Sequence, residues 1–367
     1  MSTFWNSRTR ELSPYIPGEQ PRNERYIKLN TNENPYPPSP VVIEAIKQAA
    51  DERLRLYPDP SCAALREAVA ERRHVKPEQV FAGNGSDEVL AFAFAAFFEG
   101  GRSAAPILFP SITYSFYPVY AHLWGIPYER PPLQEDFSIT HNDYLKPCGG
   151  VVFPNPNAPT GMMMPPDNVR AVARFHAGQN GRGHAVVIVD EAYIDFAGDA
   201  DAVRQASAVH YIEEHPNLLT VHTLSKSASL AGLRLGFAIG NEELIDGLCR
   251  VRDSFNSYPV DRLAMSGGIA AMKDAAYYEA ITRAVVATRE RVSAALIEMG
   301  YTVLPSSANF LFVRHPVMSG GEFFAVLRSA GILVRHFNKE RIADFLRVTV
   351  GTDAEMDAFL TVCGARL

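Results

Sequence analysis

The sequence predicts an α/β protein in two parts: a large domain with a mainly parallel mixed sheet flanked by helices, and a smaller α+β domain. Short apolar runs alternate with longer helix-like segments, and the run 184–189 is apolar on both faces, as in a buried parallel strand. After about residue 260 the pattern changes to one long helix-like segment followed by several strands. We therefore expect an N-terminal arm over 1–40 that packs with the small domain, a large domain over 41–260 and a small domain over 261–367.

The expected elements follow the same pattern along the chain. In the large domain we expect strands at 79–83, 106–109, 150–153, 184–189, 218–221 and 235–239, and helices at 86–98, 114–124 and 167–177. In the small domain we expect helices at 274–299 and 321–330, and strands at 301–304, 309–313, 332–335 and 345–350. The segment 29–38 is rich in Asn and Pro, which favours an extended arm.

Composition excludes several classes of protein. A net charge of -6, with both signs spread along the 367 residues, offers no basic surface for nucleic acid. The four cysteines lie far apart and form no CxxC pair, so we expect reduced thiols in the cytoplasm, with neither a disulfide framework nor a metal site. We find no signal-peptide pattern and no apolar run of about 18 residues, so we expect no membrane segment.

The segment 224–236, LSKSASLAGLRLG, places one lysine between two serines in an apolar context. An exposed lysine beside a helix start is the ordinary interpretation of S-K-S alone. A lysine held away from water beside other positive charge has a lowered pKa, and its free amine can form a Schiff base. Arg234 follows eight residues after Lys226 and suits a phosphate.

Asp190 directly follows a predicted buried strand and begins the motif D-E-A-Y, which ends at Tyr193. Ligands of open α/β sheets bind outside the carboxyl ends of the strands. A carboxylate at that edge can pair with a protonated ring nitrogen, although a strand-end aspartate can also simply cap a turn.

Four motifs occur in order: N-P-N-A-P-T-G at 155–161, D-E-A-Y at 190–193, L-S-K with an arginine eight residues after the lysine, and L-R-V-T-V-G at 346–351. Together they resemble the fold type I enzymes that use pyridoxal 5'-phosphate, and among these the histidinol-phosphate aminotransferases of class II. The resemblance covers nearly the whole chain. It implies that Lys226 bonds the cofactor and moves the substrate proton, that Asp190 pairs with the pyridine nitrogen, and that Tyr193 contacts O3'.

The resemblance also implies the rest of the cofactor site. The cofactor phosphate is expected to bind Gly85, Ser86, Asp87, Thr223, Ser225 and Arg234 of one subunit and Tyr57 of its partner in a homodimer. Tyr114 is expected to stack on the pyridine ring, although it lies in an aromatic run that could equally pack in the core. Ala158 stands where many relatives have the asparagine that contacts O3', so Asn157 is assigned that contact, with Asn155 as the alternative.

Four residues are expected to bind substrate: Arg335, Arg347, Tyr15 and Asn32. The implied reaction transfers the amino group of L-histidinol phosphate to 2-oxoglutarate, giving imidazole acetol phosphate and L-glutamate in histidine biosynthesis. An aromatic amino acid aminotransferase and a decarboxylase of O-phosphothreonine remain as alternatives. A cofactor-binding regulator is disfavoured, because the roughly 40 residues before the main domain are too few and too rich in Pro and Asn for a helix-turn-helix.

Overall fold

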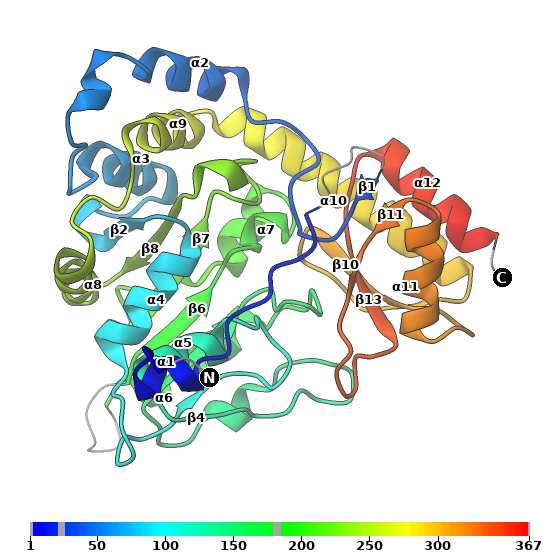
Figure 1. Ribbon diagram of the computed structural model, residues 1–367, viewed down its shortest axis with the longest axis horizontal. Helices are drawn as coiled ribbons and strands as arrows, with labels where there is room; N and C mark the ends of the chain where they lie inside the picture. Colours follow the sequence, from blue (N-terminus) through cyan, green and yellow to red (C-terminus); the bar gives the residue numbers. More distant parts are fainter. Residues whose placement is uncertain (1–2, 21–25, 179–184, 366–367) are drawn as a thin grey trace.

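The computed structural model describes residues 3–20, 26–178 and 185–365; His184 of the predicted strand 184–189 lies outside the described residues. Its centre is a seven-stranded sheet (Figure 1). The strand order is β2 (Val80–Gly83), β8 (Gly236–Gly240), β7 (Leu218–Thr223), β6 (Val187–Asp190), β5 (Gly150–Pro154), β3 (Ile107–Leu108) and β4 (Tyr128–Glu129). β8 runs antiparallel to both neighbours and all other pairs are parallel, which confirms the predicted α/β sheet.

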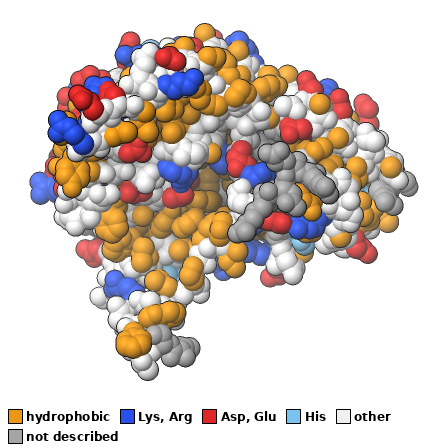
Figure 2. Space-filling view, turned by 45° about the horizontal axis from the view of Figure 1, so that its top comes forward, with side chains coloured by type: hydrophobic (Ala, Val, Ile, Leu, Met, Phe, Trp, Pro, Cys, Tyr) orange, Lys and Arg blue, Asp and Glu red, His pale blue; other side chains and the backbone are white. Residues whose placement is uncertain are grey.

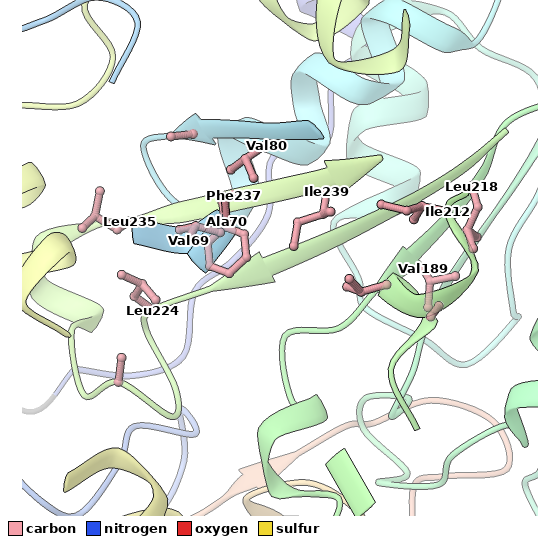
Figure 3. Close-up of a cluster of buried hydrophobic side chains, with 14 of the residues drawn as sticks. Val69, Ala70, Val80, Val189, Ile212, Leu218, Leu224, Leu235, Phe237 and Ile239 are labelled. Carbon is pink, nitrogen blue, oxygen red and sulfur yellow. The ribbon is translucent and has the colours of Figure 1, made fainter. Parts of the chain in front are cut away.

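Helices cover both faces of this sheet because successive strand side chains point to opposite sides. In β6, Val187 and Val189 belong to one core and Ile188 to the other. Figure 3 shows part of the first core, where Val189 and Phe237 lie among side chains from several strands. The helices on that side are α3 (Ala63–Arg73), α6 (Pro166–His176) and α9 (Arg262–Lys273); those on the other are α4 (Ser86–Phe97), α5 (Tyr117–Trp124) and α8 (Glu242–Phe255).

A second, smaller sheet of four antiparallel strands lies beside the first (Figure 1). Its order is β12 (Arg335–His336), β13 (Phe345–Thr349), β10 (Phe310–Arg314) and β9 (Thr302–Val303). A separate parallel pair joins β1 (Ile27–Lys28) of the arm to β11 (Ile332–Leu333). The helices packed here are α11 (Gly320–Ser329), α12 (Asp353–Gly364) and the far end of α10 (Ala275–Glu298).

The division of the chain near residue 260 remains a prediction, and two helices bear on it. α9 follows that point but packs on α2 (Pro40–Ala49) and α3. α10 contributes Tyr278 and Ile281 to the large core and Val292 and Leu296 to the small one. One helix therefore belongs to both cores. Among the described residues, no helix is long and apolar enough to cross a membrane.

Most observed bounds lie within a few residues of the predicted ones. The expected helix 114–124 begins only at Tyr117, and the expected strand 332–335 divides into β11 and β12. The structure also contains strands β1 and β4 and the longer helices α2, α3, α8, α9 and α12, which we did not predict. The short elements not yet named are α1 (Ser7–Glu11), α7 (Ala200–Ala206), η1 (Glu52–Arg55), η2 (Pro77–Gln79), η3 (His141–Tyr144), η4 (Ile194–Phe196), η5 (Ala208–Tyr211) and η6 (Ala231–Leu233).

The sheet brings several chain segments to one edge. Strands β5, β6 and β7 are parallel, so all three end there. β8 is antiparallel and therefore begins at this edge, where Gly236 pairs with Thr223 at the end of β7 and with Gly83 at the end of β2. The polar residues that follow β2, β5, β6 and β7 consequently converge on one site.

Candidate active site

Lys226 lies three residues after β7, at the edge where the strands end. Its Nζ donates a hydrogen bond to the backbone oxygen of Thr31 at 3.1 Å and lies 5.9 Å from the centre of the Tyr193 ring. Burial, together with the charge of Arg347, lowers the pKa of the Lys226 amine to about 8, against the opposing effect of Glu33 and Asp87. The amine is thus available as a nucleophile or base near neutral pH.

Asp190 ends β6 and is 5% exposed. Its carboxylate accepts hydrogen bonds from the Tyr117 hydroxyl at 2.9 Å and from the backbone N–H of Ala192 at 3.2 Å. Burial raises the pKa of Asp190 to about 6, although both hydrogen bonds oppose that rise. Among the described residues no lysine or arginine pairs with it, so the carboxylate is suited to a cationic N–H from a bound molecule.

The start of α4 forms a cup with open backbone N–H groups. Gly85 precedes the helix with φ +87° and no side chain caps it, so the helix N-terminus is free to bind an anion. A Cβ on Gly85 would lie 2.8 Å from an Arg234 nitrogen, and one on Gly236 would lie 2.3 Å from the Ser86 nitrogen. Glycine at both positions lets the backbone and Arg234 come together around the cup.

The remaining predicted phosphate residues line the same place. Arg234 donates to Ser225 at 3.4 Å and to the carboxylate of Asp87 at 3.1 Å. The hydroxyl of Thr223 accepts from the backbone N–H of Ser225. Tyr114 donates its hydroxyl to the other oxygen of Asp87 at 2.7 Å, which holds the ring at the cup.

Arg335 and Arg347 lie directly opposite each other on the neighbouring strands β12 and β13. Like charges at opposed positions repel, and no carboxylate pairs with either arginine in the described chain. Their hydrogen bonds go to backbone oxygens of Ile16 and Asn30, and the Arg347 Nε is buried without a partner. Burial lowers the pKa of Arg347. Two cations held together in this way are suited to an anionic ligand.

Two residues of the N-terminal arm, Asn32 and Tyr15, also lie at this site. Asn32, which is 1% exposed, donates its amide to the Tyr193 hydroxyl at 2.9 Å. The Tyr15 ring stacks on Phe116 at 4.4 Å, and its hydroxyl is close enough to influence the pKa of Tyr193 and Arg347. Of the two residues, Asn32 contacts Tyr193 directly, whereas Tyr15 lies near Arg347.

The two candidate asparagines differ in their free groups. Both polar ends of the Asn155 amide are occupied by the backbone of Met164. Asn157 donates to Ile112 and Thr160, and its Oδ1 is buried without a partner. Of this pair, Asn157 has the free polar atom that a ligand could use.

Tyr57 is the one predicted cofactor residue that this chain does not place with the others. Its side chain is 79% exposed and stacks on Tyr258, with ring centres 4.6 Å apart. Such a position suits a residue that acts in a neighbouring subunit.

The sequence reasoning missed Tyr117 and Asn34, and it gave the neighbouring Glu33 no specific contact. Tyr117 lies in the aromatic run 114–117, but nothing in that run shows which ring reaches Asp190. The side chain of Asn34 donates to the backbone oxygens of Lys226 and Ser227. Glu33 pairs with Lys28 and accepts from Thr31, the residue that binds the Lys226 amine. Both arm residues lie in the Asn- and Pro-rich segment 29–38.

Comparison with known families gives one decisive match. The family described as "Aminotransferase class I and II" matches residues 24–362. The chain belongs to this aminotransferase family. It is 51% identical to the histidinol-phosphate aminotransferase of Aromatoleum aromaticum over 98% of both chains, and 52% identical to that of Chromohalobacter salexigens over 98% of both chains. Among solved structures, the histidinol-phosphate aminotransferase of Sinorhizobium meliloti, in complex with pyridoxal-5'-phosphate, matches with a TM-score of 0.85 and 22% identity, over 100% of this chain and 98% of that one.

The residues present in this aminotransferase fit pyridoxal phosphate. The uncapped start of α4 and Arg234 offer donors for a phosphate, and glycines 85 and 236 leave room for it. The buried carboxylate of Asp190 lies at the same sheet edge as the amine of Lys226. The unpartnered Oδ1 of Asn157 offers one further polar contact.

Proposed function

We propose that this aminotransferase uses pyridoxal 5'-phosphate to transfer the amino group of L-histidinol phosphate to 2-oxoglutarate, as a step of histidine biosynthesis. One observation supports the substrate above all: Arg335 and Arg347 are opposed on adjacent strands without a carboxylate partner in the described chain. The names of the full-length relatives, at 51% and 52% identity, point to the same substrate.

When bound, pyridoxal phosphate supplies an aldehyde that takes up the amino group and a ring that withdraws electrons from the reacting carbon. Lys226, with its pKa lowered to about 8, would take the proton from the substrate α carbon and deliver it to the former aldehyde carbon of the cofactor. Asp190 accepts a hydrogen bond from the ring N–H and keeps that nitrogen protonated. Tyr193, held by Asn32, and Asn157 orient the ring oxygen O3'.

The phosphate of the cofactor is held by the N–H groups of Ser86 and Asp87 and by Thr223, Ser225 and Arg234, while Gly85 leaves room for it and Tyr114 covers the ring. At the other end of the site, Arg335, Arg347 and Tyr15 hold the phosphate of the substrate. Arg347 also has to hold the α-carboxylate of glutamate, for which a bidentate guanidinium is well shaped. Asn32 shapes this pocket through Tyr193.

We also propose that the enzyme is a cytoplasmic homodimer in which Tyr57 reaches the cofactor phosphate of the partner subunit. Figure 2 looks onto the side that carries α2, where apolar side chains cover much of the surface. Exposed large hydrophobic side chains include Leu54 and Leu56, which are near Tyr57 in sequence, and Tyr258, which stacks on it. Val41 and Ile43 of α2 and Phe255 at the end of α8 are exposed as well. Light scattering tests the dimer: a monomer at micromolar concentration would contradict it.

A half-reaction tests the activity. The holoenzyme is mixed with L-histidinol phosphate without any keto acid, and the visible absorbance of the cofactor is followed. We expect rapid conversion to the amine form of the cofactor and recovery on addition of 2-oxoglutarate. Conversion by phenylalanine or tyrosine alone would contradict the proposed substrate, as would release of carbon dioxide from O-phosphothreonine. Lys226→Ala is expected to bind the cofactor without a covalent bond and to lose transamination; near-normal rates would contradict the role of Lys226.

A further inference from the structure

Ser227, the residue after the reactive lysine, is held by a hydrogen bond to Asp195. Ser227 is 8% exposed, and its hydroxyl donates a short hydrogen bond to Oδ2 of Asp195. Asp195 lies in η4, two residues after Tyr193. The segment 190–196 therefore meets the lysine loop at two places, where Tyr193 lies near the Lys226 amine and where Asp195 accepts from Ser227.

Asp195 is itself fixed by a cation. Its Oδ1 accepts from Nη2 of Arg73, the last residue of α3, at 2.9 Å. Burial opposes ionisation, but Arg73 and the hydroxyl of Ser227 hold the pKa of Asp195 below its ordinary value. The nearby charges of Asp195 and Glu191 raise the pKa of Arg73 despite its burial. The pair is consequently ionised at neutral pH and anchors Ser227 to α3.

Packing alone does not hold Ser227 on this side. Arg73, Asp195 and Ser227 line a cavity of about 230 Å³ that lies between α3, α7 and α10. The side chains of Arg73 and Asp195 are 19% and 29% exposed. Because this cavity leaves Ser227 without close packing on the cavity side, the hydrogen bond to Asp195 fixes Ser227 where a filled core would otherwise do so. On the other side, Asn34 holds the backbone oxygens of Lys226 and Ser227 at 3.1 and 3.3 Å.

We propose that Asp195, anchored by Arg73, is a positioning residue that acts through Ser227 to hold the Lys226 amine in its buried, reactive place. This inference rests on the proposed role of Lys226. It assigns no contact with substrate or cofactor to Asp195, Arg73 or Ser227.

Ser227→Ala tests the inference, because it removes the hydrogen bond and leaves the Arg73–Asp195 pair intact. The first readout uses the apoprotein: the amine is acylated across a pH series, and the extent at Lys226 is measured by peptide mass spectrometry. We expect the midpoint to move up from about 8 toward the ordinary 10.5, because the amine gains access to water. The second readout is kinetic: kcat is expected to fall about tenfold to a hundredfold, with KM changed less than about twofold.

Two further variants of Ser227 keep the test decisive. Ser227→Cys nearly preserves the volume but is a weak donor, so it is expected to behave like alanine even where the alanine variant folds poorly. Ser227→Thr retains a hydroxyl and is expected to restore both the midpoint and kcat. The matched control is Asp201→Asn, which removes one negative charge from the wall of the same cavity, at a side chain 73% exposed, and is expected to change neither readout.

An unchanged midpoint and kcat in Ser227→Ala and Ser227→Cys would overturn the inference, even if their melting temperatures fall. Equal effects in Asp201→Asn would also overturn it, since the general charge of the cavity would then be responsible. Failure of the proposed function looks different: transamination would survive in Lys226→Ala, whatever the Ser227 variants do.

Discussion

The pKa of the Lys226 amine gives the most direct quantitative prediction. Burial and Arg347 lower it from 10.5 to about 8, and the charged groups that face it are Arg347, Glu33, Asp87 and Arg234. At pH 7.5 an ordinary lysine has about 0.1% of its amine free, whereas a pKa of about 8 leaves about a quarter free, a gain of about 200-fold. The structure thus accounts for a reactive amine at neutral pH without any bound group.

The assay is acylation of the apoprotein from pH 6 to pH 11, with Lys146 as the internal reference because its side chain is 48% exposed. Burial also slows entry of the reagent, so the pH midpoint is compared and not the absolute rate. Two variants should move the midpoint in opposite directions: Arg347→Gln raises it, since a repelling cation is lost, and Glu33→Gln lowers it, since an attracting anion is lost. A wild-type midpoint at 10 or above would refute this reasoning.

Three other changes have defined outcomes. Burial raises the pKa of Asp190 to about 6 from an unfolded value of 3.8, so the apoprotein should lose stability as the pH rises from about 4 to about 6. Asp190→Asn should remove that loss and gain up to about 3 kcal/mol in the free energy of urea unfolding above pH 6, while losing transamination. A variant less stable than wild type at pH 8 would contradict this. Gly236→Ala places a Cβ 2.3 Å from the Ser86 nitrogen, so we expect the free energy of unfolding to fall by about 1–3 kcal/mol. Cofactor binding, measured by fluorescence titration, should weaken as well. Unchanged binding would disprove the close approach of Gly236 to Ser86. Arg335→Gln should raise KM for L-histidinol phosphate by about 10- to 150-fold, with the glutamate half-reaction much less affected, and an equal effect on both substrates would argue against a phosphate role.

Much of the large sheet could be predicted because its strands are buried on both faces and are therefore continuously apolar. Strand β6 and the residues at its end, Asp190 and Tyr193, are examples. The helix α9 was missed because it follows the change in pattern near residue 260 and contains two adjacent glycines, which are poor helix formers. Gly267 and Gly268 in α9 lie against Leu233 and Leu235, a contact between distant segments that has no local signature.

The individual partners within the site were the least predictable part. The sequence places Asp87 near a helix start, but not the bonds that join it to Tyr114 and Arg234. Likewise, the motif D-E-A-Y does not show that Glu191 accepts hydrogen bonds from the Ser207 hydroxyl and from the backbone N–H of Ala208, at 2.6 Å each. Such contacts depend on loops that meet only after folding, so neither spacing nor periodicity records them.

The opposed arginines belong to the small sheet, whereas Lys226, Asp190 and the anion cup belong to the large one. The two arginines differ in how far their effect extends, because the charge of Arg347 lowers the pKa of Lys226 on the large sheet, whereas Arg335 is not among the groups that act on it. A substitution at Arg335 can therefore alter the anion site while leaving the reactive amine on the other sheet unchanged. For an engineer, the β12 side of the opposed pair is the natural place to randomise when a different amino donor is wanted.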